Sequence, residues 1–171
     1  MTYNTLPETG DDRPDEQDLH TLLARLSDPD KGVRAEAMHG LVTIGGPAVP
    51  ACIALLHDDD WKVRYRAAEA LGLIGDDRAY APLTAALGDG KDHVRYMAAK
   101  GLGLLGDPRA VAHLRTVQRD ENEFVRRSAA ASLGKIGGVE AVAALRSALE
   151  DEAIGGVREV ILAALRDAGA D

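Results

Sequence analysis

A Val-Arg pair recurs along this chain at nearly constant intervals. The repeats are centred on five valines: Val33, Val63, Val94, Val125 and Val157. The intervals between them are 30, 31, 31 and 32 residues, and an arginine follows each valine. A fixed period of roughly 20–50 residues indicates a solenoid, in which each unit buries its apolar face only against its neighbours. The period therefore predicts a stack of about five units.

Each unit has the sequence pattern of two helices, here named A and B. In the clearest unit, apolar residues recur every three or four positions after Val63, as on one face of a helix, and Gly75 lies where such a helix would end. The expected A helices are about 17–26, 47–56, 78–87, 109–118 and 139–149. The expected B helices are about 31–44, 61–74, 92–105, 123–136 and 157–168.

The predicted fold is therefore all-α, an α-solenoid of about five helix-pair repeats. Its units are expected at about 17–45, 46–75, 76–106, 107–137 and 138–169. Residues 1–16 are polar, acidic and without periodicity, which predicts a disordered tail; a functional acidic arm is the alternative. The formal net charge is −8, and residues 1–18 contribute −5 of it. The repeat domain, expected over 17–171, is thus nearly balanced and lacks the basic stripe of a nucleic-acid-binding protein.

Positions along each B helix are counted from its valine as zero. Positions 5 and 9 hold small residues in the middle units: Ala68, Gly72, Ala99, Gly103, Ala130 and Gly134. Small side chains allow neighbouring B helices to approach closely, and larger ones there would cost about 1–3 kcal/mol. Acids precede the B helices, as at Asp30 and Asp60, and we expect them to cap the free N–H groups.

Position 1 is arginine in all units: Arg34, Arg64, Arg95, Arg126 and Arg158. Because this arginine recurs throughout, we expect a structural ladder of ion pairs. Its partners would be acids in the links, the short segments that connect neighbouring helices, such as Asp76 or Asp107. Ligand binding is the alternative. Arg78 and Arg109, early in their A helices, have the same interpretation.

The unit around Val63 resembles a known repeat. Its pattern runs Asp60-Trp61-Lys62-Val63-Arg64, Ala70-Leu71-Gly72, Ile74-Gly75-Asp76, Arg78-Ala79, Pro82-Leu83 and Ala86-Leu87. These residues resemble the HEAT-like repeats of the phycobilisome-lyase type, and the resemblance extends over about residues 17–169. It implies a right-handed superhelix with the B helices on its concave side. Such repeats occur in bilin lyases, metabolic enzymes and adaptors, so the resemblance does not decide the function.

Residues suited to catalysis or metal binding are scattered. The histidines are His20, His39, His57, His93 and His113, and none precedes a glutamate. The His-Glu ligand pairs of the iron-dependent deoxyhypusine hydroxylases, which are HEAT-like, are thus missing. Cys52 is the single cysteine, and a buried core residue is favoured over a reactive thiol. We expect no catalytic residue, no cofactor and no metal.

Aromatic and long side chains gather at B-helix positions that we expect to face a groove, namely 2, 3, 6 and 10. The predicted protein-binding residues are Trp61, Tyr65, Arg66, Glu69, Tyr96, Met97, Lys100 and Arg127. The three aromatic residues among them serve as anchors, because aromatic side chains, Met and Arg are enriched at protein interfaces. The alternative is that these rings merely cover the stacked helices.

The favoured function is a non-enzymatic scaffold that binds a protein or peptide through the concave face of its B helices. The alternative is a bilin-lyase subunit or a chaperone for a tetrapyrrole. Self-association remains open, because Val160, Ile161 and Leu162 make the last helix more apolar than an end cap requires. No signal segment or long apolar run is visible, so we expect a cytoplasmic protein without membrane or nucleic-acid partners.

Overall fold

A computed structural model of the protein describes residues 16–170. Apart from Glu16, the predicted acidic tail lies outside the described residues. The A helices are α1 (Glu16–Arg25), α3 (Val49–Leu55), α5 (Tyr80–Ala86), α7 (Ala110–Val117) and α9 (Gly138–Asp151). The B helices are α2 (Lys31–Ile44), α4 (Trp61–Ile74), α6 (Asp92–Leu105), α8 (Glu123–Ile136) and α10 (Gly155–Asp167). Two single 3₁₀ turns, η1 (Gly46–Ala48) and η2 (Asp77–Ala79), precede α3 and α5.

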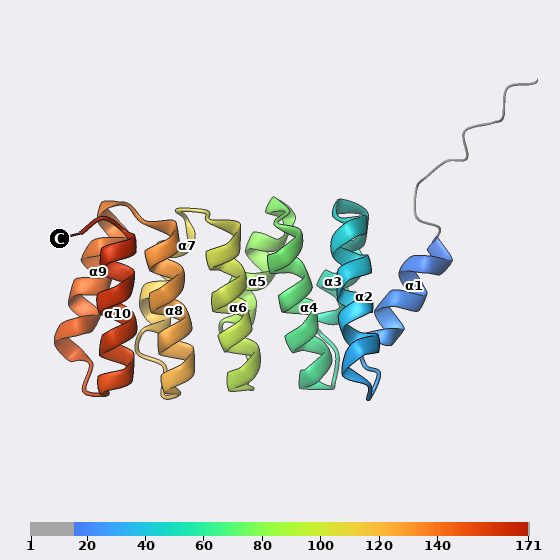
Figure 1. The fold of residues 1–171 in the computed structure, drawn as a ribbon, viewed down its shortest axis with the longest axis horizontal. Helices are drawn as coiled ribbons and strands as arrows, with labels where there is room; N and C mark the ends of the chain where they lie inside the picture. The colour runs from blue at the N-terminus through green and yellow to red at the C-terminus, as the bar shows by residue number, and fades with distance from the viewer. Residues whose placement is uncertain (1–15, 171) are drawn as a thin grey trace, which may run out of the picture.

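The helices form two layers. Figure 1 shows the B helices side by side in front, with α3, α5, α7 and α9 behind them. The part of the chain from 16 to 170 contains no strand. The predicted all-α solenoid of helix pairs is thus confirmed, and four of the five B helices begin and end at the predicted residues.

The starts and ends of the B helices follow from local chemistry. The carboxylate of Asp60 accepts the backbone N–H of Lys62, and Asp30 does the same for two residues of α2. Both helices thereby satisfy N–H groups that have no partner inside the helix. At the other end, Gly75 has a φ of 73°, a left-handed conformation that ends a helix and favours glycine.

Consecutive B helices pack closely where their side chains are small. A Cβ on Gly72 would lie 2.7 Å from the Cα of Gly101, and one on Gly134 would lie 2.8 Å from the Cα of Ala164. Only glycine allows these backbones to approach so far. Unit one differs, because Met38 and Val42 occupy positions 5 and 9 of α2. Accordingly, α2 packs much less closely on α4 than α4 does on α6.

The predicted arginine ladder is present between units two and five. Its rungs are Arg64–Asp89, Arg95–Asp120 and Arg126–Glu152, at 2.8, 2.7 and 2.7 Å. Each acid lies in the link of the following unit, so each rung joins two units. The Nη1 atom of each of these arginines also donates to a carbonyl of its own link, at Asp58, Asp89 and Asp120.

The prediction of which acids pair with the ladder arginines was wrong. Asp76 pairs instead with Arg78, and Asp107 pairs with Arg109, in each case two residues along the same link. The side chains of Arg78 and Arg109 are 54% and 64% exposed, so these pairs lie at the surface. Both pairs support the turn into the A helix, and the Nη2 atom of Arg78 also donates to the Gly46 carbonyl of the preceding unit at 2.8 Å.

Cys52 belongs to the core, as predicted, and its side chain is fully buried. Burial raises the pKa of the thiol to about 11, so it stays protonated and unreactive at neutral pH. No single helix within residues 16–170 is long and apolar enough to cross a membrane; Lys31–Ile44 and Gly46–Leu55 pass that test of length and composition only as a pair bent by 110°.

Candidate protein-interaction site

Aromatic side chains from three consecutive B helices form a continuous strip. We define the aromatic strip by five residues near the helix starts: Trp61 and Tyr65 on α4, His93 and Tyr96 on α6, and Phe124 on α8. The rings of Trp61 and His93 are 4.8 Å apart, which connects α4 to α6. Phe124 is 56% exposed, and His93 is exposed as well. Aromatic residues that are about one repeat apart in the sequence are thus neighbours in space.

A small hollow opens between the rings of the strip. Its volume is about 250 Å³, and its lining is Tyr65, Asp92, His93, Tyr96, Asn122 and Phe124. The hydroxyls of both tyrosines have no hydrogen-bond partner within the described residues, so two phenol groups are free to bind an incoming molecule. Burial, followed by the charge of Glu69, raises the pKa of Tyr65, which keeps its hydroxyl protonated as a donor.

Polar groups hold the lining of the hollow in place. Asn122 caps α8 with its side-chain oxygen and donates its amide to Asp92 at 2.6 Å. Asp92 also bonds the Nδ1 atom of His93 at 2.8 Å. The hydrogen bond from His93 lowers the pKa of the Asp92 carboxyl, which therefore stays ionised. Since these residues begin α6 and α8, the hollow is built on two rigid helix starts.

Met97 does not belong to the surface, contrary to the prediction. Its side chain is only 2% exposed and lies in the hydrophobic core. Position 3 faces the preceding B helix, as Ser128 shows by donating its hydroxyl to the Tyr96 carbonyl of α6. Arg66 occupies the same position on α4. Its Nε atom is buried without a partner, and burial and the charge of Arg34 lower its pKa.

The other predicted residues lie within the strip or beside it. Trp61, Tyr65 and Tyr96 are half-buried, so each ring both covers its helices and presents a surface. The Lys91 ammonium lies 5.2 Å from the Trp61 ring centre, and the Arg127 guanidinium lies 5.9 Å from that of Phe124. Both distances suit cation–π contacts. Glu69 and Lys100 are half-buried on α4 and α6, and neither makes an ion pair within the described chain.

His93 belongs to the strip, although it was not among the predicted binding residues. The prediction counted mainly forward from each valine; before the valines it considered only Trp61 as a binding residue and Phe124 near the edge, whereas His93 lies one position before Val94. The signal was available in Trp61, which lies two positions before Val63. Residues three or four positions apart share one face of a helix, so His93 lies on the same face as Tyr96, as Trp61 does with Tyr65.

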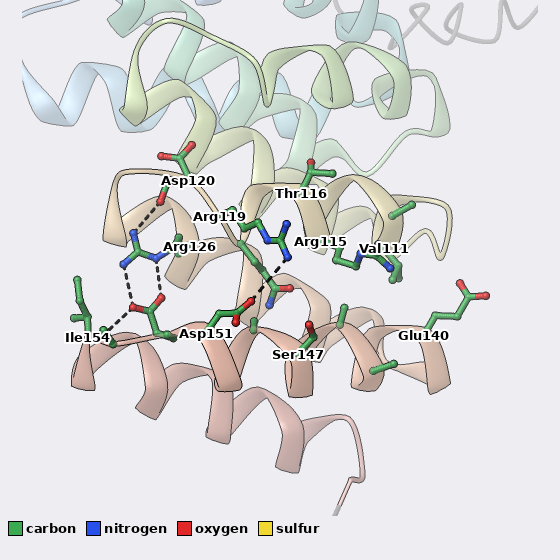
Figure 2. Close-up of a pocket in the computed structure, with 17 residues that line it drawn as sticks. Val111, Arg115, Thr116, Arg119, Asp120, Arg126, Glu140, Ser147, Asp151 and Ile154 are labelled. Atoms are coloured by element: carbon green, nitrogen blue, oxygen red, sulfur yellow. Dashed lines mark hydrogen bonds and ion pairs between the residues drawn. The ribbon is translucent and has the colours of Figure 1, made fainter.

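A larger hollow lies between α7 and α9, on the A layer. Its volume is about 1070 Å³, and small residues of α9, including Ala144, Ser147 and Ala148, line one wall. Figure 2 shows Arg115 and Arg119 on the opposite wall, with Arg119 directed at Asp151 across the opening. That contact measures 3.9 Å between two exposed side chains, so it closes the hollow only weakly. No pattern in the sequence predicted this hollow.

Neither hollow carries a metal constellation. Among residues 16–170, no group of three or more His, Cys, Asp or Glu side chains is placed to hold a metal ion. What both hollows offer is apolar surface with hydrogen-bonding groups at the rim, an arrangement that suits non-covalent binding.

Solved structures of several repeat proteins resemble this chain. It is 27% identical to a chain of the complex of CpcE and CpcF of phycocyanin lyase from Nostoc sp. PCC7120, with a TM-score of 0.80 over 88% of this chain and 99% of that one. Human deoxyhypusine hydroxylase in complex with glycerol is 25% identical, with a TM-score of 0.63; the likeness covers 92% of this chain and 64% of the hydroxylase.

A designed armadillo repeat protein in complex with the peptide (KR)4 shares the fold, with 21% identity and a TM-score of 0.61 over 88% of this chain and 81% of that one. No curated protein sequence matches the chain significantly. The model of the HEAT repeats, in contrast, matches residues 19–95 and 83–166, which together make up most of the sequence. The recurring Val-Arg units, their helix pairs and this match agree, and the chain belongs to the family of HEAT-repeat proteins.

Proposed function

We propose that this protein is a scaffold that binds a protein or peptide segment over the aromatic strip. The observation that carries the proposal is that rings of three successive helices flank one hollow, with two tyrosine hydroxyls left unpartnered in the described chain. Aromatic side chains with a polar tip supply both apolar contact and a hydrogen bond, which is why they dominate protein interfaces.

The dimensions of the strip favour an extended segment. Packed helices are about 8–10 Å apart, so a strip across α4, α6 and α8 spans about 16–20 Å. An extended chain advances about 3.3 Å per residue, and five or six residues therefore cover that length. The hollow of about 250 Å³ would take one side chain of such a segment. Arg127 and Lys100 flank the strip on α8 and α6, where they would contact polar groups of the segment.

A lyase-subunit role is the second candidate. It is favoured by the 27% identity that extends over nearly all of a chain from the phycocyanin lyase complex. Against it, the hollow of about 250 Å³ is smaller than most small-molecule pockets, which are about 300–1,000 Å³. A tetrapyrrole would therefore require the strip to open, or would bind in the hollow of about 1070 Å³ between α7 and α9. Incubation with a bilin, followed by absorbance spectroscopy, distinguishes the two: a shifted bilin spectrum supports the lyase role.

Affinity capture from cell extract, followed by mass spectrometry, tests the scaffold role. The double variant Tyr65→Ala/Tyr96→Ala is compared with wild type and with Tyr80→Ala. Tyr80 is a matched control because it lies on α5 in the A layer, against Arg109 and His113. We expect proteins that wild type and Tyr80→Ala retain to be lost from the double variant. Equal retention by all three folded proteins would contradict the proposal.

A further inference from the structure

The arginine ladder has a gap between units one and two. The Nη1 atom of Arg34 donates to the carbonyls of Asp28 and Pro29, both at 2.8 Å, as the other ladder arginines do in their own links. In Arg64, the Nε and Nη2 atoms donate hydrogen bonds to the two carboxylate oxygens of Asp89, at 2.8 and 2.9 Å. The same edge of the Arg34 guanidinium has no acceptor within residues 16–170.

Asp58 is the acid that corresponds to Asp89. Each accepts a backbone N–H two residues further on, from Asp60 and from Lys91, at 2.8 Å in both cases. Asp58 nevertheless makes no ion pair with Arg34 in the described structure. The looser packing of α2 on α4, where Met38 replaces a small residue, accounts for the separation.

A second arginine lies at the same junction of α2 and α4. Arg66 lies at position 3 of α4, which faces α2, and the charge of Arg34 acts on it. Its Nε atom is buried and has no partner. Glu69 and Asp60 attract Arg66 electrostatically, but neither comes within ion-pair distance. The later units have uncharged residues at this position: Met97, Ser128 and Val160. Two cations therefore meet only where the ladder is interrupted.

We propose that the gap between α2 and α4 is a binding site for a carboxylate of an acidic peptide segment, held by Arg34 and Arg66. A guanidinium edge matches a carboxylate in geometry and charge, as the three complete rungs demonstrate in this chain. A bound carboxylate would reduce the repulsion between the two arginines. It would lie beside Arg34 in the same way as Asp89 lies beside Arg64. The site does not depend on the aromatic strip.

Two sources offer such a carboxylate. Residues 1–15 contain Glu8, Asp11, Asp12 and Asp15, and they precede α1, which packs on α2. Fifteen residues reach at most about 50 Å when fully extended. An acidic segment of another protein is the second source. Both present the same group to the same pair of arginines.

Fluorescence anisotropy of the full-length protein with a labelled peptide of alternating Asp and Glu tests the site. The matched control peptide contains Asn and Gln. We expect the acidic peptide alone to bind, and its affinity to fall at least about tenfold in Arg34→Gln and in Arg66→Met. Methionine is the residue that α6 has at this position, so Arg66→Met preserves packing. Arg146→Gln removes an exposed, unpaired charge and should leave the affinity unchanged.

The source of the carboxylate is identified by a variant in which Glu8, Asp11, Asp12 and Asp15 are replaced by their amides. If residues 1–15 occupy the site, this variant binds the acidic peptide more tightly than wild type. If its affinity equals that of wild type, the carboxylate comes from another protein. Both results support the site, because both require binding that depends on Arg34 and Arg66.

Three results would overturn the proposal. The first is an affinity that Arg34→Gln and Arg66→Met leave unchanged, and the second is no binding by either wild type or the amide variant. The third needs no peptide. If Asp58→Asn lowers the free energy of unfolding as much as Asp89→Asn does, Arg34 already pairs with Asp58 in solution. Arg34 then has no unpaired guanidinium edge, and the site does not exist.

Discussion

The Nε and Nη2 atoms of Arg95 donate to the two carboxylate oxygens of Asp120, which lies 25 residues further along the chain, at 2.7 and 2.9 Å. The same guanidinium donates to the Asp89 carbonyl at 3.0 Å, so one side chain binds the links of two successive units. The Arg95 and Asp120 side chains are only 12% and 10% exposed. In a solenoid, where each unit contacts only its neighbours, such a rung stabilises the interface on which the stack depends.

Removing this arginine should destabilise the protein strongly. Arg95→Met leaves the Asp120 carboxylate largely buried without its partner, and breaking a buried pair from one side costs about 3–5 kcal/mol. The free energy of unfolding from urea titrations measures the effect. Arg25→Met is the control, because Arg25 pairs with Glu36 inside unit one through side chains that are 39% and 71% exposed, and we expect a loss below about 1 kcal/mol. Similar losses in the two variants would show that the rungs have no special role.

Acid should weaken the stack through the same rungs. The hydrogen bond from Arg64 lowers the pKa of Asp89, and that from Arg126 lowers the pKa of Glu152. A carboxyl whose pKa is lower in the folded state binds protons more tightly when unfolded. Its contribution is therefore complete above the unfolded pKa of about 4 and is lost as the pH falls through the folded value.

We therefore expect a melting temperature that is steady near neutral pH and falls steeply below about pH 4. Thermal unfolding, followed by circular dichroism across this range, measures it. Asp89→Asn should melt lower than wild type at neutral pH, and the difference should shrink in acid, where the wild-type carboxyl is protonated as well. A difference that stays constant with pH would mean that the charge of Asp89 contributes nothing.

The close packing of α4 on α6 predicts a strong effect of a single methyl group. In Gly72→Ala the new Cβ would lie 2.7 Å from the Cα of Gly101, so the two backbones must separate. We expect a loss of about 1–3 kcal/mol in urea unfolding, as is usual for an overpacked core. Gly90→Ala is the matched control, since no atom lies within 4 Å of its new Cβ. An equal response at the two glycines would show that the helices tolerate separation.

The sequence predicted the fold well because the repeat supplies several copies of one pattern. The valine register placed α2, α4, α6 and α8 at their observed residues, and the repeated arginine predicted a ladder. The acids that pair with this arginine were misassigned. Each arginine pairs with an acid between the two helices of the following unit, and the sequence pattern does not show how close these two segments lie in space. Asp76, chosen from the link that follows helix B, lies beside Arg78 instead.

The binding site was less predictable, because a residue's environment there depends on the neighbouring unit. Position 3 was assigned to the groove, yet Met97 is buried against the preceding helix, while Arg66 at the same position meets a more open junction. The difference arises from α2, whose Met38 and Val42 prevent close packing on α4. Periodicity identifies equivalent positions, but it does not show that their surroundings are equal.

Phe124 offers the sharpest test of whether the aromatic strip serves a partner or the fold. Its ring is 56% exposed, so Phe124→Ala removes little buried area, and we expect a loss of stability below about 1 kcal/mol. Leu71→Ala, a fully buried core substitution, should cost about 2–5 kcal/mol and calibrates the measurement. If Phe124→Ala costs as much as a core leucine, the ring covers the stacked helices and has no need of a partner. A small loss leaves an exposed phenylalanine beside two unpartnered tyrosine hydroxyls, a surface that folding alone does not require.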